Sequence, residues 1–140
     1  MRFKKILCPV DFSDCAHDAL LRAADIAKDS SAELMLIHVY SPPGQDGFLY
    51  VPDMLTQLQR SAEEAIAGWV AEAKKLGVGK VSGHAIMGAA WDTIVQRARD
   101  EGCDLIVMGT NGRTGLKRAL IGSVAERVVR HAPCTVMVVR

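Results

Sequence analysis

The 140-residue sequence lacks the features that mark membrane and secreted proteins. No run of about 18 apolar residues occurs, so no membrane-spanning helix is expected. The basic start at Met1–Lys5 is followed only by the short apolar run Ile6–Val10, which is too brief for a secretory signal peptide. We therefore expect a cytoplasmic protein.

Cysteine, aromatic residues and net charge are also scarce. Aromatic residues make up 5% of the chain, so aliphatic side chains and alanine must build the core. The formal net charge is only +1, and we expect neither a membrane nor a nucleic acid as a partner. The cysteines follow no C-x2-C or other ligand spacing, so we interpret them as reduced thiols. They are Cys8, Cys15, Cys103 and Cys134.

Several catalytic and nucleotide-binding signatures are absent. The sequence has no G-x4-G-K-[ST], which excludes a P-loop nucleotidase, and no G-x-G-x-x-G after its first apolar run, which argues against dinucleotide binding. The Ser-Gly-Gly signature of adenylating enzymes that release pyrophosphate is missing too. No paired acids, lysine or arginine finger is placed for phosphoryl transfer, and the histidines have no Ser or Cys partner at a suggestive spacing. We identify no catalytic residue.

What the sequence contains is a regular alternation of apolar strands and amphipathic helices. Strands covered by helices on both faces are continuously apolar, so this pattern predicts an α/β fold with a parallel sheet, in one domain over residues 1–140. The predicted strands are Lys5–Val10, Glu33–Val39, Lys80–Met87, Asp104–Met108 and Cys134–Val139. The predicted helices start after the N-cap Ser13, run over Met54–Leu76 and Ala90–Glu101, and follow Ser123, while Ser41–Asp53 is a loop.

The most informative segment lies near the end of the chain. The sequence G-T-N-G at 109–112 is followed, after nine residues, by Gly122-Ser123. These glycines lie between a strand that ends at Met108 and a helix that begins after Ser123. Glycine allows close approach of the main chain to a ligand, and a helix start offers unpaired N–H donors and the positive end of a dipole. We predict an anion site here, suited to phosphate.

This glycine pattern resembles that of the ATP-binding branch of the universal stress protein family. The likeness covers nearly the whole chain, because the opening KKILCPVDFS, the segment LIHV and the ending APCTVMVV are also similar to that family. It implies an open five-stranded parallel sheet of order 3-2-1-4-5, the Rossmann-like adenine nucleotide alpha hydrolase-like fold. In that order the chain reverses between the first and fourth strands, where ligands of open α/β sheets bind.

The first and fourth strands both end at this reversal. The glycine spacing and the binding rule for open α/β sheets therefore predict the same position for the site. From the residues alone, Asp11 fits either a turn or capping aspartate or a partner for ribose or adenine, and the resemblance favours the nucleotide. The loop offers donors but few acids, so we expect Mg²⁺ to accompany the phosphates. The predicted site residues are Pro9, Val10, Asp11, Val39, Met108, Gly109, Thr110, Asn111, Gly112, Arg113, Gly122, Ser123 and Val124.

The resemblance implies a stress-response or signalling module that binds ATP or another adenine nucleotide, with at most weak ATP hydrolysis. Two alternatives stay open. One is a slow ATPase or autokinase; the other is a nucleotide-free interaction module that uses residues 111–140, which hold six Lys and Arg against one acid. We also predict a homodimer through Thr135–Val139, an apolar strand at the sheet edge without Lys or Pro, which is the strand that the family's usual dimer uses.

Overall fold

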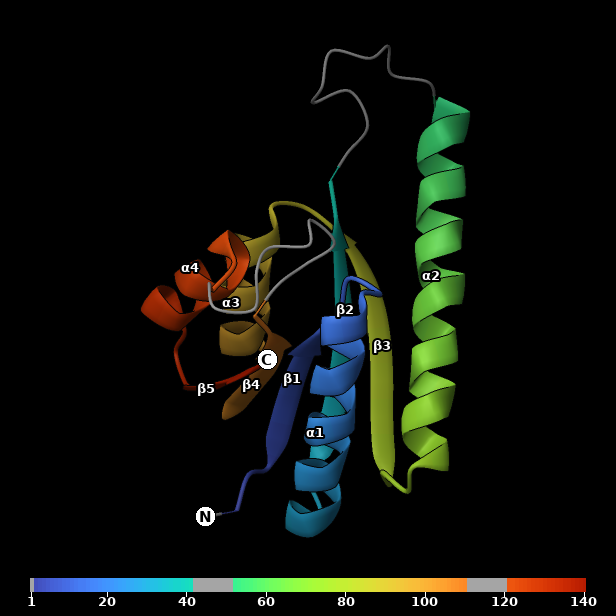
Figure 1. Cartoon of the computed structure of the whole chain (residues 1–140). Coiled ribbons are helices and arrows are strands. Elements are labelled where there is room, and N and C mark those ends of the chain that lie inside the picture. The colour runs from blue at the N-terminus through green and yellow to red at the C-terminus, as the bar shows by residue number, and fades with distance from the viewer. Residues whose placement is uncertain (1, 42–51, 111–120) are drawn as a thin grey trace.

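The structure, a computed structural model, describes residues 2–41, 52–110 and 121–140. These residues form one five-stranded sheet of order β3-β2-β1-β4-β5, in which every neighbouring pair of strands is parallel (Figure 1). The predicted strand order and parallel class are therefore confirmed. The strands are β1 (Lys5–Pro9), β2 (Glu33–Tyr40), β3 (Lys80–Met87), β4 (Leu105–Gly109) and β5 (Thr135–Val139).

The described residues also form four helices, which cover the two faces of the sheet. Ser13 caps the first helix as predicted, because its side chain accepts a hydrogen bond from the main-chain N–H of Ala16. The second helix begins at Pro52, inside the predicted loop; proline suits a first helical turn, where its missing N–H would have no partner. The helices are α1 (Asp14–Ser30), α2 (Pro52–Lys75), α3 (Ala90–Asp100) and α4 (Ser123–His131).

The core has one apolar layer on each face of the sheet. Ile6, Leu34 and Val107 face the α1 and α2 side, while Leu7 and Ile106 face the α3 and α4 side. Among the described residues the largest fully buried side chains are aliphatic apart from Cys8, as the low aromatic content predicts. Each contributes about 1.5–3 kcal/mol by leaving water. The buried alanines that bring α1 close to the sheet are Ala16, Ala19, Ala23, Ala24 and Ala27.

Helix α2 lies directly against β3 at a glycine. A Cβ on Gly83 would fall 2.5 Å from Cγ2 of Val70 and 3.2 Å from Cγ1 of Ile66, both on α2. No side chain fits between the helix and the strand at this point.

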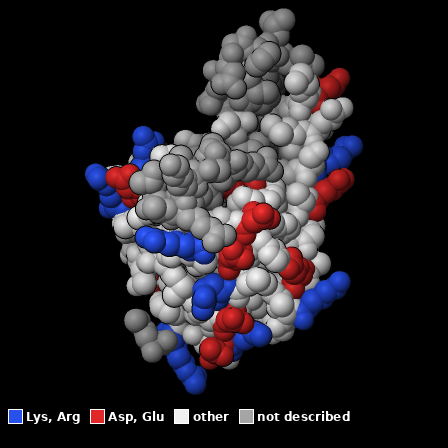
Figure 2. Space-filling model, viewed as in Figure 1, with Lys and Arg blue, Asp and Glu red and all other residues white. Residues whose placement is uncertain are grey.

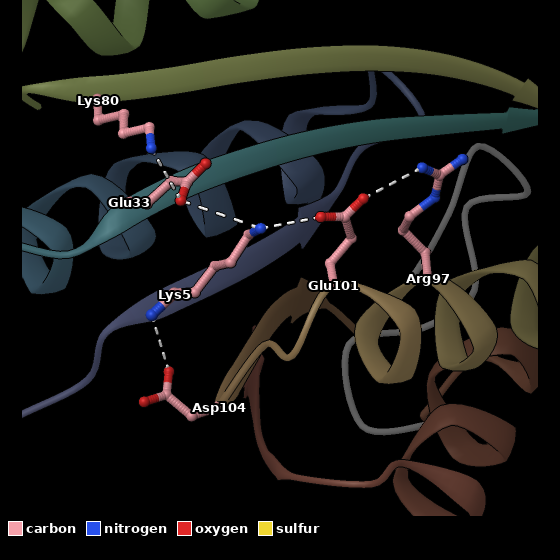
Figure 3. Close-up of polar contacts among 6 residues, drawn as sticks. All are labelled: Lys5, Glu33, Lys80, Arg97, Glu101 and Asp104. Carbon is pink, nitrogen blue, oxygen red and sulfur yellow. Dashed lines mark hydrogen bonds and ion pairs between the residues drawn. The ribbon is translucent and has the colours of Figure 1, made fainter.

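A network of charges crosses the amino ends of the strands (Figure 3). The ammonium of Lys5 donates to Oε2 of Glu101 at 2.9 Å and lies 3.9 Å from Oε2 of Glu33. The Asp104 carboxylate accepts from the main-chain N–H groups of Lys4 and Lys5 at 2.9 and 3.0 Å. These contacts join β1 to β2 and to the segment that enters β4.

The hydrogen bond between Lys5 and Glu101 affects the titration of both groups. It raises the pKa of Lys5 and lowers the pKa of Glu101, with nearby Arg97 acting in the same direction on Glu101. Both groups are therefore charged in the folded protein at neutral pH.

Replacing Lys5 by methionine should lower the free energy of unfolding at neutral pH. Because the pKa of Glu101 is lowered in the folded state, its stabilisation is present above the ordinary glutamate pKa of about 4.3 and is lost as the pH falls through the lowered value. The difference between wild type and Lys5→Met should thus shrink in acid. Urea denaturation at several pH values measures it, with Lys75→Met as the control, since Lys75 is exposed at the end of α2 and lies outside this network. A difference that is equally large at about pH 7 and about pH 3 would contradict this account.

Candidate functional site

The predicted site lies at the carboxyl ends of β1 and β4, which are neighbours in the sheet. The chain leaves β1 toward α1 on one face, and α4, which follows β4, packs on the other face (Figure 1). The strand connections therefore separate here, as the sequence analysis expects. Of the predicted residues, Asn111, Gly112 and Arg113 lie outside the described residues.

Asp11 orients the turn between β1 and α1. Its Oδ1 accepts hydrogen bonds from the main-chain N–H of Ser13 at 3.0 Å and from the Ser13 hydroxyl at 2.5 Å. The Ser13 hydroxyl in turn accepts from the N–H of Ala16 at 3.1 Å. Asp11 therefore has the turn role that the sequence left as one of its two alternatives. Its role toward a nucleotide stays a prediction.

Phe12 has a backbone conformation that the sequence does not indicate. Its φ is +65°, in the left-handed region, which costs a residue other than glycine about 1–2 kcal/mol. Its ring lies 4.5 Å from the ring of His38 and 5.4 Å, edge to face, from that of Trp69 on α2. These contacts hold the strained turn against β2 and α2.

His38 connects the end of β2 to the same turn. Its Nδ1 lies 2.8 Å from the carbonyl oxygen of Val10, so the ring donates Nδ1–H to that carbonyl. The N–H of Val10 donates to the carbonyl of Ile37 at 2.8 Å. The β1–α1 turn is thus held from β2 by a main-chain and a side-chain hydrogen bond.

Gly109 is where the start of α1 meets β4. A Cβ at this position would lie 2.7 Å from Sγ of Cys15 and 3.0 Å from the carbonyl carbon and oxygen of that residue. Among the glycines in the described ranges, positive φ occurs at Gly77 and Gly102, so the Gly109 backbone does not need left-handed freedom. The close approach at Gly109 that the structure shows is to a helix of the same chain.

A chain of hydrogen bonds joins β5, the end of β4 and the start of α4. Buried Thr110 donates its N–H to the carbonyl of Val139 at 2.9 Å, and Gly122 donates its N–H to the carbonyl of Thr110 at 2.6 Å. Cys15 also reaches this junction, because its thiol donates to the Val139 carbonyl at 3.5 Å. The start of α1 therefore adjoins the carboxyl ends of β4 and β5.

The N-cap residue of α4 has no side chain that could cap the helix. The N-cap is Gly122, with φ −64° and ψ 158°, and glycine has no side-chain acceptor for the first N–H groups of the helix. Ser123 is exposed and Val124 is half-buried. The positive end of the helix dipole thus lies directly after a junction with β4. This geometry can accept an anion.

Pro9, Val39 and Met108 lie beside this junction as packing residues. Met108 is buried in the apolar layer on the α3 and α4 face, and Val39 packs against the same layer. Pro9 ends β1 and is half-buried. All three have packing roles in the fold, and their contact with an adenine ring stays a prediction.

The cysteines do not form a reactive or metal-binding centre within the described ranges. All are free thiols, and burial raises the pKa of Cys8 to about 12 and that of Cys103 to about 11. No three His, Cys, Asp or Glu side chains of the described residues gather in a way that could hold a metal ion. None of the helices in the described part is long and apolar enough to cross a membrane.

Comparison with known proteins agrees with this architecture. The model of the universal stress protein family matches residues 2–140. The chain belongs to this family. It is similar to universal stress protein MJ0531 of Methanocaldococcus jannaschii, with 38% identity over 99% of this chain and 82% of that protein.

Solved structures of family members share the fold. Universal stress protein UspA from Lactobacillus plantarum has a TM-score of 0.85 and 28% identity, and the match covers 100% of this chain and 99% of that chain. A universal stress protein solved in complex with cAMP has a TM-score of 0.76 and 26% identity, covering 100% of this chain and 99% of that chain. The resemblance noted in the sequence is thus confirmed at the level of the family and the fold.

Replacing Gly109 by alanine should destabilise this universal stress protein by about 1–3 kcal/mol, because the added methyl overlaps main-chain atoms of Cys15 that cannot turn away. Chemical denaturation measures the change. Gly79→Ala is the matched control, since a Cβ there meets nothing within 4 Å. Equal stability of Gly109→Ala and Gly79→Ala would show that α1 does not depend on this contact.

Proposed function

We propose that this chain binds ATP, or another adenine nucleotide, where β1 and β4 diverge, and that it works as a stress-response module through its bound state. The observation that carries the proposal is the start of α4 at its glycine N-cap, Gly122, which Thr110 holds against the end of β4. The similar universal stress protein in complex with cAMP supports an adenine nucleotide. The free cysteines suit a reducing compartment, so a cytoplasmic location is part of the proposal.

The two parts of the nucleotide would meet different residues. The phosphates would lie at the glycine loop and the start of α4, where main-chain N–H groups offer donors. The adenosine would lie on the apolar ends of β1, β2 and β4, with the Asp11 carboxylate accepting from ribose or adenine. The phosphate group of residues is Gly109, Thr110, Asn111, Gly112, Arg113, Gly122, Ser123 and Val124; the adenosine group is Pro9, Val10, Asp11, Val39 and Met108.

A magnesium ion would accompany the phosphates. Mg²⁺ keeps several waters and binds through phosphate oxygens with one or two protein oxygens, so it needs no dedicated cage of carboxylates. The described residues offer no such cage. The ion would therefore be held largely by the nucleotide itself.

Replacing Gly122 by valine should abolish ATP binding while the fold survives. Its φ of −64° is open to any residue, but a branched side chain would stand where the phosphate must approach the first N–H groups of α4. Isothermal titration calorimetry with Mg-ATP measures the affinity, and Gly79→Val is the matched control at an open glycine. The affinity of wild type should also fall when a chelator removes Mg²⁺.

Unchanged affinity in a folded Gly122→Val protein would overturn the proposed phosphate position.

A single-turnover assay with Mg-ATP separates a binding module from the rival slow ATPase or autokinase. We expect intact ATP, because no residue of the described site is arranged as a general base or transition-state cation.

We also propose that two copies pair through β5. This strand is at the sheet edge, and its Met137 is an exposed apolar side chain, as is Val129 on α4. Two copies related by a twofold axis would pair their β5 strands antiparallel and bury these side chains. The resemblance to the family supports the same strand.

A lysine in place of Met137 should weaken this dimer at least tenfold, because two charges would meet in an apolar interface. Val138→Pro should act in the same direction by removing a main-chain donor. Light scattering coupled to size exclusion measures the mass, with exposed Met54→Lys as the control. A monomeric wild type at micromolar concentration would refute the β5 dimer.

A further inference from the structure

Strand β3 forms the opposite edge of the sheet, and no other described strand covers it. Soluble proteins usually protect an edge with proline, a central lysine or a bulge. β3 has no proline, and its one lysine, Lys80, stands at its first position. Within the described residues β3 pairs only with β2, so its outer N–H and C=O groups have no strand partner.

A groove runs beside this edge between α2 and β3. Glu63, Ala67, Ala71 and Lys74 line it from α2, and Gly83 forms part of its floor. Ala67 and Ala71 are both exposed, and they lie one turn apart on the same face of α2. Exposed alanines leave room for a second helix to approach closely. Figure 1 shows α2 and β3 together at the end of the sheet away from α3 and α4.

The two ends of the groove carry opposite charges. Glu63 and Lys74 are both exposed and stand about 16 Å apart along the helix axis. Figure 2 shows acidic and basic side chains following one another along the side of the molecule where α2 lies. A partner that runs antiparallel to α2 and carries the same two residues would meet each charge with its opposite.

We propose that the β3–α2 edge is an interface for a second copy of this chain. A twofold axis through the midpoint between Glu63 and Lys74 would place Glu63 of each copy beside Lys74 of the other. This midpoint, next to Gly68, lies over Gly83, because Gly83 packs between Ile66 and Val70. Gly83 is also central in β3, so the same axis would pair the two β3 strands antiparallel. The charge pairing on α2 and the strand pairing of β3 are therefore both satisfied by the same twofold axis.

This pairing also accounts for a buried hydroxyl. Oγ of Ser82 is buried and has no hydrogen-bond partner among the described residues. With Gly83 opposite itself, Ser82 would stand opposite the exposed His84 of the second copy. Directly opposed residues of an antiparallel pair point to the same face, so the imidazole would lie beside the hydroxyl.

The proposed interface is independent of the nucleotide and of the β5 pairing. It uses the other edge of the sheet, so the two interfaces can exist in one assembly of more than two copies. An experiment that disproves this interface would therefore leave the nucleotide proposal untouched, and the reverse also holds.

Sedimentation equilibrium of the full chain, from micromolar to millimolar concentration, tests the interface. We expect a concentration-dependent doubling of mass that persists in a Met137→Lys background. Glu63→Lys and Lys74→Glu should each weaken this association about tenfold, because each turns both reciprocal pairs repulsive. The double variant Glu63→Lys/Lys74→Glu should restore it. Ala67→Arg should abolish it by filling the groove.

The matched controls are Glu64→Lys and Lys75→Glu, which make the same charge changes on α2 outside the groove lining and should leave the association unchanged. Wild type that does not associate in the Met137→Lys background would overturn the proposal. So would an association that the two single charge reversals do not weaken, or one that the double variant fails to restore.

Discussion

The close approach of α1 to β4 at Gly109 is the contact on which the rest of the carboxyl end depends. With no side chain at Gly109, the start of α1 reaches the strand, and Cys15 extends to the Val139 carbonyl. The same carbonyl accepts from Thr110, which in turn holds Gly122 at the start of α4. The missing Cβ therefore lets α1 start against the end of β4, the same strand end to which the start of α4 is hydrogen-bonded through Thr110.

The two ends of the sheet are held by different forces. At the amino end, Lys5, Glu33, Glu101 and Asp104 join neighbouring strands through charged contacts (Figure 3). At the carboxyl end the described contacts are mainly main-chain hydrogen bonds and ring packing around Phe12. The amino end keeps its charges paired with one another, whereas the carboxyl end presents the main-chain donors of a helix start, where we propose that the nucleotide binds.

Periodicity and glycine spacing predicted much of the fold. The pattern placed all five strands within one or two residues, four of them as continuous apolar runs and β3 as a more polar segment, and the resemblance supplied their order. Helix α2 begins two residues before its predicted start, because Pro52 was interpreted as part of the loop, whereas proline also suits the first turn of a helix. Phe12 gave no signal, since a left-handed turn at a phenylalanine is held by rings from β2 and α2 that are distant in the sequence.

By itself the sequence determined which segments are strands, which faces are apolar, and that a helix would begin close to Gly122 and Ser123. Those properties follow from local pattern and residue type, which are present before the chain folds. Only the tertiary structure showed that α1 packs against Gly109 and that His38 donates a hydrogen bond to the Val10 carbonyl. It also showed that Gly83, Glu63 and Lys74 line one groove at the β3 edge. These depend on contacts between segments far apart in the sequence, and no local pattern records such distances.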